Sequence, residues 1–281
     1  MPTPDARVLH WRAGALLPAT STQPEPSDDA PRATARPEPD TLLVADSWLT
    51  VDGATRGLEL HRARFVAGVE AQLGGAAPAA AELDDFWAAV AATLPREGRL
   101  FPRAELVSGP DTAPPRLQLR LRPAPATHTT ITLATHHGAD PRTQPTIKGP
   151  DLDSLQLLRA PAQAVGADEA VLLVDGRLIE GATTALLWWN GDTLVTVPSW
   201  VPRVSSVTEL SIRALATALG TEVVEYLATP EELDHKEIWA VNALHGIRLV
   251  TAWSDGPTPA AELGRHARWR RGLDALRRPA T

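Results

Sequence analysis

The chain has 281 residues, of which 43% are hydrophobic and 22% are charged, so it is expected to fold around one or two cores. Cysteine is absent, which excludes a disulfide scaffold, a thiolate zinc site and a cysteine nucleophile. The net charge of −7 argues against nucleic-acid binding. No apolar run reaches membrane-spanning length and no signal peptide opens the chain, so we expect a cytoplasmic protein without a membrane partner.

The first 140 residues predict two helices among short strands. Residues 1–40 are expected to hold an N-terminal strand and a Pro-rich insertion, because most of their second half contains no apolar residue larger than alanine. Apolar residues at helical spacing predict helices over 58–73 and 82–94. Strands are expected over 42–51, 116–122 and 129–135, with a hairpin turn at Asp52-Gly53.

The second half combines helices with antiparallel hairpins. Helices are predicted over 154–165, 206–219 and 266–278, and strands over 170–174, 177–180, 185–189, 193–197, 223–227, 238–244 and 247–253. This order is not a regular βαβ series, so the fold class is α+β. We expect a small domain over 41–140 and a larger one over 141–281. Of Trp188 and Trp189, one is expected in the core and one at the surface, because side chains alternate along a strand.

Only two of the 27 basic residues are lysine, Lys148 and Lys236. Arginine can replace lysine at most surface positions, but it cannot lose its proton to become a nucleophilic amine. A lysine that persists in such an arginine-rich chain is therefore a candidate reactive amine. Lys148 lies in an irregular segment after a strand, whereas Lys236 lies in the charged run 231–237, which is expected at the surface. An ordinary surface role remains the alternative for each.

Two further elements suit a cofactor that carries an aldehyde and an anion. Glu180 ends a hairpin strand and precedes a small, hydroxyl-rich turn at 181–184. The segment 205–208 opens a predicted helix with two serines and a threonine, and such a helix start binds anions through free N–H groups, hydroxyls and the helix dipole. Alone, each has an ordinary explanation, a solvated glutamate or a helix cap. No metal site is predicted, because His136-His137 lacks a carboxylate at helical spacing.

These motifs occur in a recognisable order. They are Lys148, Gly166 to Ala170, Glu180-Gly181, Ser206-Val207-Thr208 and Asn242-Ala243-Leu244, preceded by His61-Arg62-Ala63-Arg64-Phe65. In order and spacing the region from 41 to 253 resembles the class IV aminotransferases, which are pyridoxal-phosphate enzymes of fold type IV. The resemblance implies a two-domain α+β fold similar to that of D-amino-acid aminotransferase, with mixed and antiparallel sheets and flanking helices. It also implies a homodimer.

The resemblance assigns roles to individual residues. Lys148 would bind the cofactor aldehyde covalently and move a substrate proton, and Glu180 would keep the pyridine nitrogen protonated. The cofactor phosphate would be held by Arg64 and by Ser206, Val207 and Thr208 at the helix start. The remaining cofactor contacts would come from Thr183, Asn242 and Ala243.

Three functions follow from the resemblance. The motif at 242–244 and the position of Ser47 favour aminodeoxychorismate lyase, which releases pyruvate and 4-aminobenzoate for folate biosynthesis. The first alternative is an aminotransferase that acts on branched-chain or D-amino acids, and the second is a non-catalytic scaffold of the same fold. Ala185, Glu209 and a shortened loop at 121–125 depart from the family pattern, so they leave the substrate open.

A small amino-acid-like substrate carries a carboxylate, which an arginine fork binds at two points. On the predicted strand, Arg116, Arg120 and Arg122 share one face because side chains alternate. We therefore expect Arg120 or Arg122 to bind the substrate carboxylate, with Arg142 as the next candidate.

Overall fold

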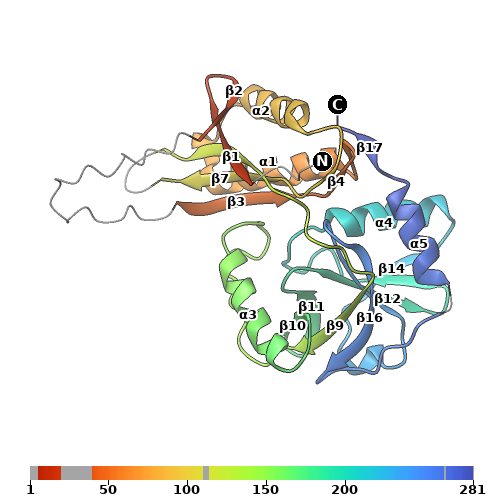
Figure 1. Cartoon of the computed structure of the whole chain (residues 1–281). Coiled ribbons are helices and arrows are strands. Elements are labelled where there is room, and N and C mark those ends of the chain that lie inside the picture. Colours follow the sequence, from red (N-terminus) through yellow and green to blue (C-terminus); the bar gives the residue numbers. More distant parts are fainter. Residues whose placement is uncertain (1–5, 20–39, 110–113, 263, 281) are drawn as a thin grey trace, which may run out of the picture.

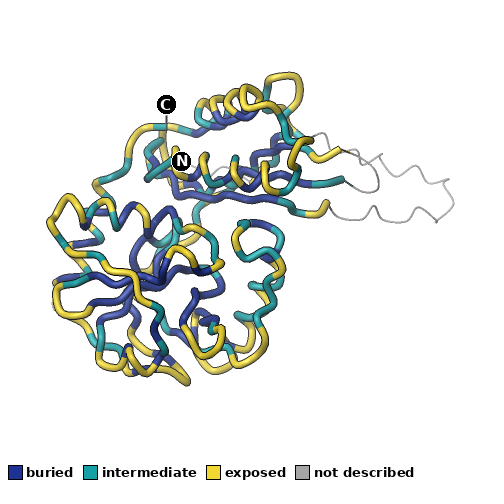
Figure 2. The backbone as a smooth tube through the Cα atoms, turned by 180° about the vertical axis from the view of Figure 1, so that it is seen from behind, coloured by how far each residue is buried: buried dark blue, intermediate teal, exposed yellow. Residues whose placement is uncertain are grey.

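The computed structural model describes residues 6–19, 40–109, 114–262 and 264–280, and Figure 1 shows that they form two lobes. Much of the Pro-rich insertion predicted within 1–40 lies outside these residues. Within the described part of the chain, no helix is both long enough and apolar enough to cross a bilayer. In each lobe the buried backbone follows the central strands, and the exposed backbone lies mainly on helices and connections (Figure 2).

The first lobe contains a five-stranded antiparallel sheet and a small four-stranded one. The larger sheet has the order β2-β1-β8-β7-β3, formed by Ala15–Pro18, Arg7–Arg12, Arg116–Leu121, Arg103–Ser108 and Thr41–Ser47. The smaller has the order β17-β5-β4-β6, formed by Arg278–Pro279, Ala54–Thr55, Thr50–Val51 and Arg99–Leu100. Helices α1 (Leu58–Leu73) and α2 (Ala80–Thr93) bury an aromatic core between them and the sheet, made of Trp48, Phe65, Phe86 and Trp87.

Helix α1 approaches strand β3 closely, and this sets the position of the polar residues on both. Gly68 makes the approach possible, because a Cβ atom there would lie 2.9 Å from Cγ1 of Val44. His61 precedes Gly68 by about two turns and Phe65 by about one, and both are buried with it. The same helix therefore brings His61 and Arg64 to the end of β3.

The second lobe is built on an eight-stranded mixed sheet with three helices, α3 (Leu152–Ala164), α4 (Val207–Ala218) and α5 (Arg265–Asp274). In the order β11-β10-β9-β16-β15-β12-β13-β14 its strands are Arg177–Gly181, Glu169–Val174, Thr130–Thr135, Gly246–Ser254, Ile238–Asn242, Ala185–Asn190, Thr193–Thr196 and Val223–Glu225. Most neighbouring strands pair antiparallel, but β9 runs parallel to both β10 and β16, and β14 runs parallel to β13. The α+β class with mixed and antiparallel sheets is confirmed.

The expectation that one of two adjacent tryptophans lies at the surface is wrong. Trp188 and Trp189 point to opposite faces of β12, and both are buried. The sheet is covered on both faces, so alternation separates two cores here. Trp189 packs edge-to-face against Trp239 and Trp269, the latter contributed by α5.

The chain changes lobes earlier than the boundary we expected at residue 140. Strand β9 ends at Thr135 but hydrogen-bonds within the eight-stranded sheet. The chain also returns to the first lobe at its end, where β17 pairs antiparallel with β5. The domain limits 41–140 and 141–281 remain a prediction. In the structure, strands β1 to β8 belong to the sheets of the first lobe, and β9 is the first strand of the eight-stranded sheet.

Candidate active site

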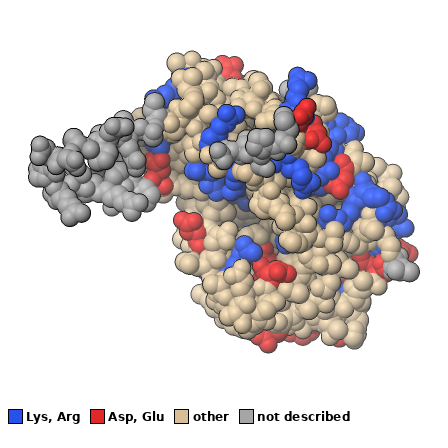
Figure 3. Space-filling view, in the orientation of Figure 1, with Lys and Arg blue, Asp and Glu red and all other residues tan. Residues whose placement is uncertain are grey.

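A cavity of about 480 Å³ lies between the two lobes, within the size range of small-molecule sites. Figure 3 shows basic side chains gathered beside the hollow between the lobes. All the predicted site residues belong to the described part of the chain, and Arg120 alone among them does not line the cavity. The residues that line it as predicted are Ser47, Arg64, Arg122, Lys148, Glu180, Thr183, Ser206, Val207, Thr208, Asn242 and Ala243.

Lys148 is held against the edge of the first lobe by its backbone. Ala45 of β3 donates its N–H to the carbonyl of Lys148 at 2.7 Å. Gly149 has φ +145°, and a Cβ atom there would lie 2.8 Å from the Val44 Cα, so only glycine fits this approach. No described residue hydrogen-bonds the Lys148 amine, and burial, aided by Arg64, lowers its pKa to about 8. The amine is therefore readily deprotonated and free to react.

Glu180 lies in β11 and faces the cavity from the second lobe. Its carboxylate accepts a hydrogen bond from Nη1 of Arg142 at 2.5 Å, and Arg142 is itself paired with Asp140. Burial raises the pKa of Glu180 to about 7, although Arg142 opposes this rise. Arg142 was our reserve candidate for the substrate carboxylate. The structure instead places it as the residue that orients Glu180.

Arg64 is fixed by a buried acid that the sequence reasoning missed. Asp46, at the end of β3, accepts hydrogen bonds from Nε and Nη2 of Arg64, both at 2.8 Å, and lies 2.6 Å from Nδ1 of His61. Burial alone would raise the pKa of Asp46, but Arg64 and His61 lower it to about 2. An aspartate directly after the apolar run 42–45 was the available signal, since a buried carboxylate needs partners.

The start of α4 completes a cationic cradle across the two lobes. Arg64 donates from Nη1 to the carbonyl of Ser205 at 2.7 Å, and the Ser206 hydroxyl caps the helix by accepting from the N–H of Glu209. The first N–H groups of a helix lack intrahelical acceptors, so those of Val207 and Thr208 are available to an anion. Arg64 and the start of α4 therefore lie together at one wall of the cavity, and their binding of a phosphate remains a prediction.

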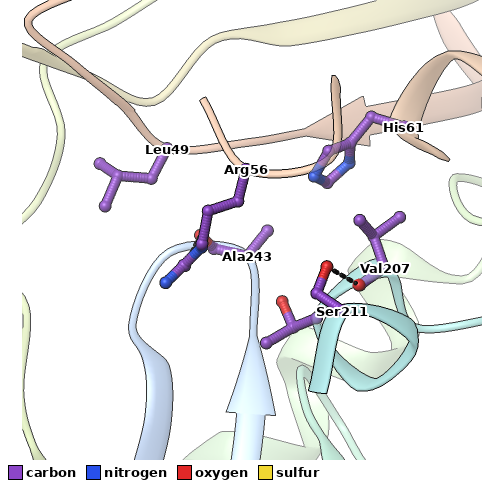
Figure 4. Close-up of a pocket in the computed structure, with 7 residues that line it drawn as sticks. Leu49, Arg56, His61, Val207, Ser211 and Ala243 are labelled. Atoms are coloured by element: carbon purple, nitrogen blue, oxygen red, sulfur yellow. Dashed lines mark hydrogen bonds between the residues drawn. The ribbon is translucent and has the colours of Figure 1, made fainter. Parts of the chain in front are cut away.

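The turn between β15 and β16 is held beside this cradle by Arg56. Figure 4 shows Arg56, Ala243 and Val207 around a second, water-sized cavity of about 10 Å³. Nη2 of Arg56 donates to the Ala243 carbonyl at 3.2 Å, and Nη1 pairs with Asp274 at 3.0 Å. A buried arginine thus fixes the position of the turn that carries Asn242 and Ala243.

Thr183 and Asn242 form one wall of the cavity. Asn242 donates from Nδ2 to the Thr183 carbonyl at 3.4 Å. The Thr183 hydroxyl and N–H both donate to Glu169, a buried residue of β10. The hydroxyl of Thr183 therefore donates its hydrogen bond within the protein, to Glu169.

The predicted arginine strand divides its residues between different partners. Arg120 pairs with Glu105 at 3.0 Å and lies outside the cavity, so its assignment to the substrate is not supported. Arg122 follows the last residue of β8, so the alternation of side chains between the two faces of the strand does not apply to it. It donates from Nε to the Phe101 carbonyl at 2.8 Å and from Nη2 to the Ser47 hydroxyl at 3.4 Å. Arg103, which the sequence did not suggest, lines the same wall.

Comparisons with known proteins agree with this architecture. A family model described as amino-transferase class IV matches residues 43–253. A hypothetical aminotransferase from Mycobacterium tuberculosis, in its pyridoxal-phosphate-bound form, has 18% identity and a TM-score of 0.73, over 97% of this chain and 98% of that one. The branched-chain amino acid aminotransferase of Escherichia coli has 17% identity and a TM-score of 0.75, over 98% and 94%.

A proposed 4-amino-4-deoxychorismate lyase from Legionella pneumophila is also similar, with 16% identity and a TM-score of 0.69, over 83% of this chain and 90% of that one. No curated protein sequence matches the chain. At these identities the structural likeness establishes the fold, and the fold-type-IV architecture expected from the sequence is confirmed.

Proposed function

Because the chain belongs to the class IV aminotransferase family, we propose that it uses pyridoxal phosphate through the residues that meet in the interlobe cavity. The observation that supports this proposal most strongly is that three features line one cavity. They are the amine of Lys148, to which no described residue is hydrogen-bonded, the buried acid Glu180, and Arg64 with the start of α4. These match the aldehyde, the ring nitrogen and the phosphate of that cofactor. When bound, pyridoxal phosphate supplies an electron sink for the bonds of the carbon that carries the substrate amine.

Each residue contributes a distinct physical effect. Lys148 would hold the cofactor through its amine, and the lowered pKa of that amine suits it to take up and return a proton at the carbon that bears the substrate amine. Glu180, oriented by Arg142, holds a proton at the ring nitrogen. Arg64 and the start of α4 bind the phosphate, with Asp46 keeping Arg64 in place.

The reaction we propose is that of an aminodeoxychorismate lyase, releasing pyruvate and 4-aminobenzoate for folate synthesis. The support is the motif Asn242-Ala243-Leu244, together with Ser47, which lines the cavity beside Arg122. Arg122 remains a partly buried cation at neutral pH, since burial and Arg103 lower its pKa only to about 10. It would therefore bind a substrate carboxylate. We also propose a homodimer located in the cytoplasm.

A product assay tests this reaction. The holoenzyme is incubated with aminodeoxychorismate, and separately with pairs of branched-chain or D-amino acids and 2-oxo acids. Pyruvate and 4-aminobenzoate in equal amounts, absent with Lys148→Ala, would support the lyase. Amino-group transfer without either product would replace the lyase by an aminotransferase. A cofactor-bound protein with no turnover on any pair would leave the scaffold interpretation.

A further inference from the structure

Arg248, in β16, is a buried cation for which the described residues supply no hydrogen-bond or ion-pair partner. It lines the interlobe cavity and is only 7% exposed. Its Nε atom is buried with no hydrogen-bond acceptor, and among the described residues none accepts a bond from its guanidinium or forms an ion pair with it. An unpaired charge in the interior is costly unless something compensates it. A ligand that enters the cavity is the available source of compensation.

The neighbours of Arg248 favour an anion. His245 accepts the N–H of His128 at Nδ1, at 3.1 Å, so its ring proton is on Nε2 and can be donated. Burial, followed by Arg248, lowers the pKa of His245 to about 4, which keeps the ring neutral. Arg159 of α3 lines the same part of the cavity and adds a second positive charge.

The nearby acids do not neutralise this cluster. Glu169 also lines the cavity, but one carboxylate oxygen accepts the Ala170 N–H and the other accepts both donors of Thr183. Burial raises the pKa of Glu169. Asp168 is likewise used, because it accepts the N–H and the hydroxyl of Thr132. Neither acid lies within 4.0 Å of Arg248 as an ion pair in the described chain.

We propose that Arg248, assisted by His245 and Arg159, binds a second carboxylate of the substrate. The inference rests on the proposed function, in which Arg122 binds the first carboxylate. Arg122 belongs to the first lobe and Arg248 to the second, and both line one cavity. The substrate class is therefore a dicarboxylate that spans the cavity between the lobes, and a monocarboxylate would leave Arg248 without compensation.

Calorimetry with a matched pair of unreactive acids tests the subsite. Glutarate and pentanoate have the same chain length but two carboxylates and one, respectively. The holoenzyme should bind glutarate at least about tenfold more tightly than pentanoate. Arg248→Gln should abolish this preference by weakening glutarate alone, and Arg248→Lys should restore part of it. Arg177→Gln removes the same charge at an exposed position outside the cavity and should keep the preference. An undiminished preference in Arg248→Gln would overturn the proposal.

Two controls separate binding from other roles of Arg248. Without ligand, Arg248→Met should melt no lower than the wild type, because the guanidinium has no hydrogen-bond or ion-pair partner among the described residues to lose. Its visible cofactor absorbance should also be unchanged. A lower melting temperature would indicate a structural arginine, and loss of cofactor would indicate a phosphate contact, so either would overturn the inference.

The acid-binding test does not depend on turnover, so the two proposals fail separately. A failed product assay with an intact glutarate preference overturns the lyase only. Active lyase without the preference overturns the subsite only.

Discussion

The charged side chains that the two lobes bring to the cavity differ in how they are partnered. In the first lobe, Arg64 is bound by Asp46 and by the Ser205 carbonyl, and Arg122 by the Phe101 carbonyl. In the second half of the chain, Lys148 and Arg248 have no hydrogen-bond partner among the described residues. Hydrogen bonds fix a partnered arginine in one geometry. A buried cation without a partner marks a position where an anionic ligand group would compensate the charge. The contrast separates arginines whose geometry the protein fixes before a ligand arrives from cations whose charge a ligand would have to compensate.

The largest effect should come from the unpartnered lysine. Lys148→Ala should lower kcat/KM by more than about 1,000-fold and remove the visible absorbance of the bound cofactor, because no other lysine lines the cavity in the described chain. Absorbance spectra and steady-state kinetics check this. Lys236→Ala is the matched control, since Lys236 bonds Asn190 away from the site and should leave both measurements unchanged. The reverse pattern would invalidate the whole assignment.

The next effect should come from the acid that Arg142 orients. Glu180→Gln should retain the cofactor but slow kcat by at least about 10- to 100-fold, since a charge-assisted buried hydrogen bond is worth about 1.5–3 kcal/mol. Stopped-flow kinetics with the cofactor content measured in parallel would check it. Glu225→Gln, on a surface strand, should be without effect. An unchanged kcat in Glu180→Gln would make this acid purely structural.

A smaller effect should distinguish the two arginines of the strand. Arg122→Leu should raise KM about tenfold with unchanged cofactor absorbance, because one charge-assisted contact to a carboxylate is lost. Arg120→Leu should leave KM unaltered, since Arg120 faces Glu105 outside the cavity. If both variants keep the wild-type KM, the first carboxylate is bound elsewhere.

The smallest effect concerns stability without cofactor. Lys148→Met should raise the free energy of unfolding at pH 7 by about 1 kcal/mol, because the wild type must hold a charged amine that burial disfavours. Below pH 8 this penalty is fully present. Between pH 8 and about 10.4 the folded amine has lost a proton that the unfolded one keeps, so wild-type stability rises and the gap closes. Urea unfolding from pH 7 to 10 measures it, with Lys236→Met showing no such pH trend.

Much of the fold could be predicted because its signals are local. The helix at 58–73 was predicted with the bounds of α1, and the hairpin at Asp52-Gly53 joins β4 and β5. The burial of both Trp188 and Trp189 could not be predicted, because it depends on α5, which is distant in the sequence. Strands β7 and β17 lack a distinct sequence pattern and are defined by the strands they pair with.

The positions of site residues could be predicted where a local motif determines the backbone. Their side-chain partners could not be predicted, because several neighbours in the folded chain could form each hydrogen bond. Lys148 and the start of α4 follow from local sequence and meet in the cavity. The pairing of Arg142 with Glu180 and of Arg64 with Asp46 depends on tertiary contacts. Arg120 and Arg122 are two positions apart, but Arg120 pairs with Glu105 outside the cavity and Arg122 lines it, because β8 ends between them. The two-residue alternation of side chains predicts which face a residue occupies only within the strand, which here ends at Leu121.

The pairing of β17 with β5 has a kinetic consequence. It joins Arg278 to Thr55, so a strand of the first lobe is supplied by the far end of the chain, after the whole second lobe has been made. Contacts of such high sequence separation form late and slow folding, since a long loop must close before they contribute. During synthesis on the ribosome, the second lobe would therefore be complete before β17 adds to the edge of the four-stranded sheet of the first lobe. The catalytic cleft should acquire its final shape only in the last step of folding.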